Sequence, residues 1–114
     1  MQLNIELKVI KEGLEKFQGV ARRFDIRVRN KKVCYIDDYA HHPEEIKATL
    51  KSVKTIFPEK KLTLVFQPHL FSRTHDFMDE FAEALSLADQ VLLMEIYPAR
   101  EKPIPGVTSS VLLE

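Results

Sequence analysis

The sequence predicts an α/β fold: a Rossmann-like sheet with parallel strands, an N-terminal β-hairpin and flanking helices. Three observations support this class. Short apolar stretches with strand character alternate with longer amphipathic stretches of helical period. Hydrophobic residues make up 45% of the 114 residues, a usual share for a globular domain. Polar, ionisable residues follow the strands at three points, as expected where parallel strands present their carboxyl ends to a ligand.

The first predicted helix has an apolar face. Its apolar residues recur every three or four positions, at Leu3, Leu7, Ile10, Leu14 and Phe17. A glycine just past this stretch, Gly19, is a suitable stop. Two interpretations stay open: the face packs on the core of this chain, or it docks on another domain.

A hairpin and a second helix follow. Residues 24–29 alternate apolar and charged side chains, and residues 32–37 return after a turn at Asn30. A helix is predicted from Pro43, because proline suits the first helical position, where its missing N–H had no partner. Glu44 and Glu45 then place negative charge in the first turn.

The remaining elements alternate strand and helix. Residues 62–66 form a short strand, and a polar turn leads to a helix with Phe77, Phe81 and Leu85 on its inner face. Ser72 or Thr74 is expected to cap that helix. Residues 90–96 form the last strand, before a proline-rich loop. The predicted order is hairpin, helix, strand, helix, strand in a single domain.

Composition excludes several classes of function. The formal net charge is zero, which gives no electrostatic case for binding nucleic acid or a membrane surface. A single cysteine indicates a reducing compartment, so a cytoplasmic location is expected. No apolar run approaches the ~20 residues of a membrane span. Only three glycines occur, far apart, so the chain carries no phosphate-binding loop of its own.

Two residues stand out chemically in the polar turns. The Asp38 carboxylate could accept two hydroxyl donors from a ribose, although a turn or cap role would also explain it. Arg73, near the start of a helix, could hold a carboxylate or phosphate with its planar fork. The alternative for Arg73 is a surface ion pair with Asp76 or Asp79. The four histidines lack the spacing of a zinc site, so no metal is expected on this chain.

Four ordered motifs carry a family resemblance. They are Phe17-Gln18-Gly19-Val20-Ala21-Arg22-Arg23-Phe24, Asp37-Asp38-Tyr39-Ala40-His41-His42-Pro43, Phe66-Gln67-Pro68-His69-x-x-Ser72-Arg73-Thr74, and Tyr97-Pro98-Ala99-Arg100-Glu101 with Pro103-Ile104-Pro105-Gly106. The chain resembles the C-terminal domain of Mur ligases, in the branch that adds L-alanine to UDP-N-acetylmuramate during peptidoglycan synthesis. The motifs cover residues 17–106.

The resemblance implies an ATP-dependent amide ligase of three domains. An N-terminal domain would hold the UDP-sugar, and a central ATPase domain would hold ATP and magnesium. This C-terminal domain would close over ATP and the incoming amino acid. ATP would phosphorylate the muramate carboxylate, and the amine of L-alanine would displace the phosphate to form an amide.

The resemblance also implies site residues by position. Arg23 and Asp38 would bind the nucleotide, at its phosphates and its ribose. The substrate-binding positions would be Tyr39, His41, His42, His69 and Arg73. Leu70 stands where many members have a second arginine, and Phe71 where a tyrosine is common. The carboxylate clamp would then have one arginine.

The chain would be a fragment of that enzyme, inactive by itself and without tightly bound cofactor. Residues 1–18 could belong to the preceding central domain, and an exposed sheet edge would allow dimers to form. Two alternatives stay open. One is the murein tripeptide ligase of wall recycling, and the other is a stand-alone α/β module that binds a nucleotide or carboxylate without catalysis.

Overall fold

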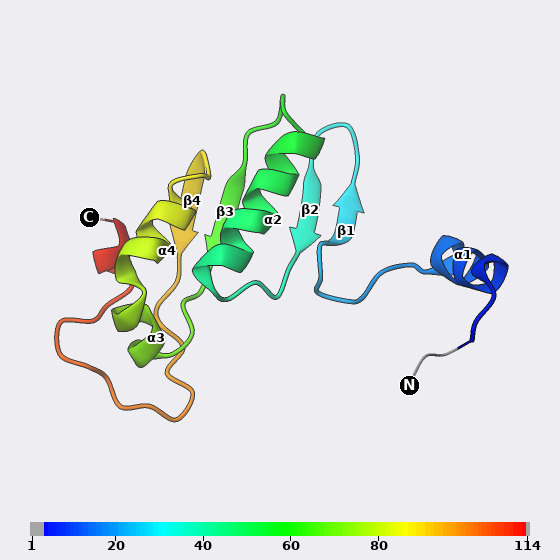
Figure 1. Cartoon of the computed structure of the whole chain (residues 1–114). Coiled ribbons are helices and arrows are strands. Elements are labelled where there is room, and N and C mark those ends of the chain that lie inside the picture. The colour runs from blue at the N-terminus through cyan, green and yellow to red at the C-terminus, as the bar shows by residue number, and fades with distance from the viewer. Residues whose placement is uncertain (1–3, 114) are drawn as a thin grey trace. The chain divides into compact units, whose positions relative to one another are not determined.

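The computed structural model describes residues 4–113, so the expectation that Leu3 continues the first apolar face lies outside the described residues. The elements in chain order are α1 (Leu7–Lys16), β1 (Asp25–Arg29), β2 (Cys34–Asp37), α2 (Pro43–Ile56), β3 (Thr63–Phe66), α3 (Phe71–Asp76), α4 (Met78–Leu85), β4 (Gln90–Leu93) and a 3-10 turn, η1 (Ser110–Leu113) (Figure 1). They fall into two compact units, Met1–Tyr39 and Ala40–Glu114.

The first unit contains the predicted hairpin. β1 and β2 pair antiparallel, with Asp25 opposite Asp37 and Arg29 opposite Cys34. The side chain of Asn30 forms the turn, because its Oδ1 accepts the backbone N–H groups of Lys32 and Val33 at 2.9 and 2.8 Å. An asparagine side chain that accepts the backbone N–H groups of the turn stabilises it, which explains why the chain reverses direction here.

Helix α1 precedes the hairpin and has no buried residue. Leu7 and Leu14 on its apolar face are 83% and 69% exposed. The apolar face of α1 is thus exposed, and its docking on another domain stays a prediction.

The second unit has a parallel strand pair covered by helices. β3 and β4 run parallel, in register from Thr63 opposite Gln90 to Phe66 opposite Leu93 (Figure 1). Helix α2 begins at Pro43 as predicted, and its residue Glu45 reaches back to accept the backbone N–H of His42 at 3.2 Å. The helices α2 and α4 pack together on the strands and enclose the core of this unit.

The core residues share almost complete burial. They are Ile46, Leu50, Phe66, Phe81, Ala84, Leu85 and Leu112. Phe81 is 1% exposed, and burial of such a side chain contributes about 1.5–3 kcal/mol. The opposite side of the strand pair is open, since Val65 and Leu92 are 62% and 59% exposed. The core thus fixes the strands and helices that carry the polar turns.

The α/β class is confirmed. Within residues 4–113 the strands form two small sheets, β1–β2 and β3–β4, and the parallel strands predicted are those of the second. The helix predicted around Phe77 is two helices, since Phe77 (φ −122°, ψ 30°) separates α3 from α4. The prediction that Ser72 or Thr74 caps a helix is wrong, because α3 begins earlier and both residues lie inside it. β4 ends at Leu93, earlier than predicted. No helix within residues 4–113 combines the length and apolar character that a bilayer-spanning segment needs.

Candidate functional site

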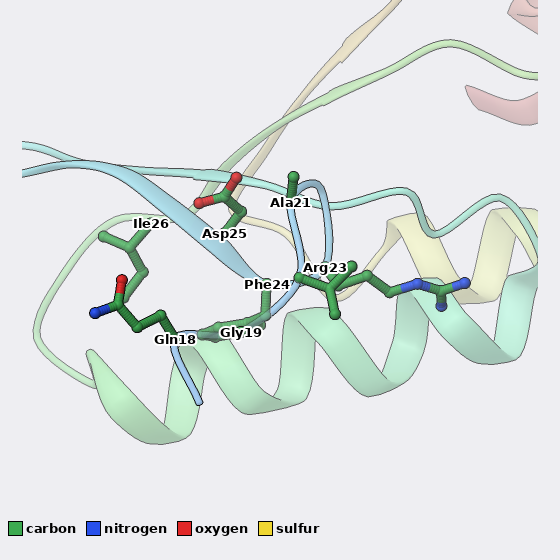
Figure 2. Close-up of a pocket in the computed structure, with 8 residues that line it drawn as sticks. Gln18, Gly19, Ala21, Arg23, Phe24, Asp25 and Ile26 are labelled. Atoms are coloured by element: carbon green, nitrogen blue, oxygen red, sulfur yellow. The ribbon is translucent and has the colours of Figure 1, made fainter. Parts of the chain in front are cut away.

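The turn before β1 carries Arg23 at the edge of an open hollow of about 460 Å³, formed by residues 18–21 and 23–26. Figure 2 shows the Arg23 side chain extending away from the Asp25 carboxylate. No hydrogen bond or ion pair of the Arg23 guanidinium occurs within residues 4–113. Its neighbour Arg22 lies 3.8 Å from Asp37 through Nε. Of the adjacent arginines, Arg22 thus forms an ion pair, and the binding of a nucleotide by Arg23 stays a prediction.

Asp38 holds this turn in shape. Its Oδ2 accepts the backbone N–H of Phe24 at 2.7 Å, across 14 residues of sequence. Phe24 has φ of 48° and Arg22 has φ of 59°, a left-handed conformation that is unfavourable for residues with a Cβ. The carboxylate therefore fixes a strained loop beside Arg23. The turn role considered for Asp38 is observed, and its predicted contact with a ribose stays a prediction.

Tyr39 lies against the same turn. Its backbone N–H donates to the carbonyl oxygen of Arg22 at 2.7 Å, and the Arg22 guanidinium lies 5.0 Å from the centre of its ring. The cation over the ring face is a cation–π arrangement. In the first unit the structure thus brings Arg23, Asp38 and Tyr39 to one turn.

The two histidines lie at the start of α2. His41 donates its backbone N–H to Glu45 Oε2 at 3.0 Å, and its Nδ1 is 3.5 Å from the same oxygen. His42 is the residue that precedes the helix, and its ring meets the Phe77 ring edge-on at 4.8 Å. His42 therefore contacts the junction of α3 and α4 through Phe77.

The polar turns after β3 and β4 meet directly. The backbone N–H of Tyr97 donates to Pro68 O at 2.8 Å, and that of Leu70 donates to Tyr97 O at 3.0 Å. The rings of His69 and Tyr97 stack with centres 5.4 Å apart. These contacts extend the parallel pairing beyond the strands. The predicted meeting of strand ends is confirmed for these two turns.

Arg73 lies half-buried in α3, directly after this meeting point. Its guanidinium makes no hydrogen bond or ion pair within the part of the chain that the structure describes. Asp76, one of the two expected partners, instead lies 3.0 Å from Nδ1 of His75. The ion-pair alternative for Arg73 is thus not observed, and the group is available to a carboxylate.

Sequence reasoning gave no role to one residue of this cluster, Glu101. Its carboxylate accepts the hydroxyl and the backbone N–H of Ser72, and these bonds hold the pKa of Glu101 below its usual value. The only sequence signal was its place in the fourth motif. A role for Glu101 depends on a contact across 29 residues, which spacing alone does not reveal.

The described residues were also considered as metal ligands. No group of three or more His, Cys, Asp or Glu side chains within residues 4–113 is arranged to hold a metal ion.

Each unit, described by itself, has a guanidinium group beside a turn that adjoins a strand, Arg23 in the first and Arg73 in the second, and neither group makes a hydrogen bond or ion pair within residues 4–113. The fold is that of an α/β domain. A family model described as "Mur ligase, glutamate ligase domain" matches residues 22–114. The chain belongs to the Mur ligase family. The predicted family resemblance is confirmed.

Individual relatives agree with this family. The chain is 60% identical over 109 residues to the UDP-N-acetylmuramate–L-alanine ligase of Cytophaga hutchinsonii, covering 96% of this chain and 23% of that protein. It is 55% identical over 105 residues to the ligase of the same name from Phocaeicola vulgatus, covering 92% of this chain and 23% of that protein. The chain thus spans about a quarter of the length of these curated relatives.

Solved structures agree as well. The UDP-N-acetylmuramate–alanine ligase of Thermotoga maritima aligns with a TM-score of 0.68 and 40% identity, over 82% of this chain and 20% of that one. A murein peptide ligase from Psychrobacter arcticus aligns with a TM-score of 0.63 and 25% identity, over 96% of this chain and 22% of that one.

Proposed function

We propose that this chain is the C-terminal domain of an ATP-dependent ligase that adds L-alanine to UDP-N-acetylmuramate in peptidoglycan synthesis. The observation that carries the proposal is the half-buried Arg73 guanidinium, which has no partner within residues 4–113. A planar cation held open in this way suits the carboxylate of an amino acid. The 60% identity to a ligase of this name supports the choice of reaction.

The proposed roles divide between the two units. In the first, Arg23 reaches the phosphates of ATP, Asp38 accepts hydroxyl donors of its ribose, and Tyr39 lines the substrate. In the second, Arg73 holds the carboxylate of the incoming amino acid. The site is completed by substrate contacts from His41, His42 and His69. The grouping described above supports this division: Arg23, Asp38 and Tyr39 share one turn, His41 and His42 lie at the start of α2, and His69 and Arg73 lie at the turn before α3 and in α3 itself.

ATP and magnesium are bound, in this proposal, chiefly by the central ATPase domain of a longer ligase. We expect the 114 residues alone to release no phosphate from ATP. The segment 1–18, which contains helix α1 (Leu7–Lys16), docks on the central domain in this proposal, and the exposed apolar face of α1 supports this. The location proposed is cytoplasmic, where UDP-sugars and ATP are available.

A chimeric enzyme tests the proposal. This chain replaces the matching segment of the Cytophaga hutchinsonii ligase, to which it is 60% identical. Phosphate release that needs ATP, UDP-N-acetylmuramate and L-alanine together is the expected result. A folded chimera that releases no phosphate with L-alanine would count against the proposal.

A second candidate is the murein tripeptide ligase of wall recycling. It is favoured by the alignment with the Psychrobacter arcticus murein peptide ligase over 96% of this chain. Leu70, where an arginine is common in the family, also favours it, since loss of a cation changes how a carboxylate is held. Assaying the chimera with L-alanine and with the tripeptide separates the two.

A further inference from the structure

The loop after β4 makes a two-point contact with α3. Glu101 Oε1 accepts the Ser72 hydroxyl at 2.6 Å, and Oε2 accepts the Ser72 backbone N–H at 3.0 Å. Both oxygens of one carboxylate therefore engage one residue, 29 positions earlier in the sequence. Charge-assisted bonds of this kind are shorter and stronger than neutral ones. The contact fastens the proline-rich loop to the start of the helix that carries Arg73.

This contact replaces an ordinary helix cap. The residue that precedes α3 is Leu70, whose side chain cannot accept a hydrogen bond. The first N–H groups of a helix have no partner within it, and that of Ser72 is satisfied by Glu101. A negative charge at this end is also favourable for the helix dipole.

The turn before α3 is strained. Leu70 has φ of 75° and ψ of 132°, a conformation that residues with a Cβ rarely adopt. It is held from both sides, since its N–H donates to Tyr97 O at 3.0 Å and its carbonyl accepts the buried Thr74 hydroxyl at 2.8 Å. Such strain persists only where surrounding contacts over-determine it, and here Tyr97 of the loop and Thr74 of α3 supply those contacts.

Arg73 is the next residue after Ser72. The Glu101 carboxylate accepts the two Ser72 donors, and no ion pair between it and the Arg73 guanidinium occurs within residues 4–113. The two consequences fit together: the helix start is fixed, and the cation beside it is left open.

We propose that Glu101 is a positioning residue for the amino-acid site, acting through Ser72 to fix the backbone from which Arg73 projects. The proposal rests on the proposed ligase function for its kinetic consequence. It predicts that the loss of Glu101 weakens capture of the incoming amino acid and leaves binding of ATP unaffected.

Kinetics of the chimera test this. In the Glu101→Ala variant we expect KM for L-alanine to rise about tenfold while KM for ATP stays within about twofold. Glu101→Gln should recover part of the loss, because an amide oxygen still accepts one Ser72 donor. Glu83→Ala is the matched control, since Glu83 pairs with Lys47 on the helices outside these turns. An equal rise in both KM values, or no rise, overturns the proposal.

The Ser72→Ala variant tests the same contact from its other partner, so that the test still holds if the Glu101 variants do not fold. It removes only the hydroxyl, and we expect the same selective rise in KM at a smaller size. The double variant with Glu101→Ala should be no worse than Glu101→Ala alone, because both remove one contact. Independent, additive losses would contradict a shared contact.

Amide hydrogen exchange in the 114-residue chain tests separately whether Glu101 fixes the backbone at Ser72 and Arg73. We expect exchange at Ser72 and Arg73 to accelerate about tenfold in Glu101→Ala and to be unchanged in Glu83→Ala. If the unaltered chimera is inactive, the ligase function fails while the exchange result still decides the positioning role. Unchanged exchange at Ser72 and Arg73 overturns that role.

Discussion

The Asp38 carboxylate accepts the backbone N–H of Phe24 at 2.7 Å and so joins the end of β2 to the turn that carries Arg23. This contact places the two residues proposed for nucleotide binding in one local structure. A change at Asp38 therefore has two separable effects, on the turn and on the ligand.

Replacing Asp38 separates these effects. Asp38→Asn keeps an oxygen that can accept the Phe24 N–H, so the free energy of unfolding should change by less than about 0.5 kcal/mol. KM for ATP in the chimera should still rise about tenfold, because an amide accepts fewer ribose hydroxyl donors. Asp38→Ala should additionally cost about 1 kcal/mol of stability, since the Phe24 N–H is left without its acceptor. Urea unfolding and steady-state kinetics give the two numbers, and an unchanged KM in Asp38→Asn would exclude the ribose role.

Replacing Arg73 tests the carboxylate clamp. Arg73→Lys keeps the charge but removes the planar fork, so KM for L-alanine should rise by about 10- to 100-fold. Stability should change little, because the guanidinium makes no bond within residues 4–113. Arg27→Lys is the control, since Arg27 is exposed and pairs with Asp25 at 3.2 Å. Equal effects of the two substitutions on KM would contradict the clamp.

Acid unfolding tests the state of Glu101. The hydroxyl and N–H of Ser72 hold the pKa of Glu101 below its ordinary value of 4.5 in the folded chain. The unfolded chain then binds more protons in this range, so the stabilisation is complete above pH 4.5 and is lost as pH falls through the folded pKa.

Urea unfolding of the 114-residue chain and of Glu101→Gln, at pH values on both sides of 4.5, measures this. The variant should be less stable above that pH, and the difference should shrink on acidification. The pKa of Asp89 is also lowered, by the Leu62 N–H and by Lys54. Asp89 is present in both proteins, so its contribution to the pH dependence cancels in the difference between them. A difference that does not depend on pH would refute the charged contact.

Amide exchange tests whether α1 depends on another domain. The helix has ten residues, includes Gly13 and buries none of its side chains. Isolated helices of this length are marginal in water, so amides of α1 should exchange almost as fast as in an unfolded chain. Amides near Leu50 in the core should be strongly protected. Comparable protection in α1 and α2 would show that α1 is stable by itself.

Local chemistry explains what the sequence could predict. The start of α2 follows from Pro43, Glu44 and Glu45, and the hairpin turn follows from Asn30, because each signal acts within a few residues. The start of α3 could not be predicted in this way. It depends on the strained Leu70, which is held by Tyr97, and on Ser72, which is held by Glu101. These are contacts between turns far apart in the sequence.

The candidate site likewise has features that the sequence could predict and features that only the structure reveals. Arg73 was identified by its residue type and its family motif, yet only the structure shows that Asp76 pairs with His75 instead of with Arg73. The predicted gathering of all three polar turns is confirmed for those after β3 and β4, through Tyr97 and Leu70. The meeting of Asp38 with Arg73 around one set of ligands stays a prediction.

A structure of the chimera with ATP, UDP-N-acetylmuramate and an unreactive analogue of L-alanine bound tests that claim most directly. We predict that Asp38 contacts the ribose hydroxyls and that the Arg73 guanidinium holds the carboxylate of the analogue, both within hydrogen-bond distance. Side chains of Asp38 and Arg73 that face different sides of the domain, with the ligands beyond the reach of both, would contradict the account.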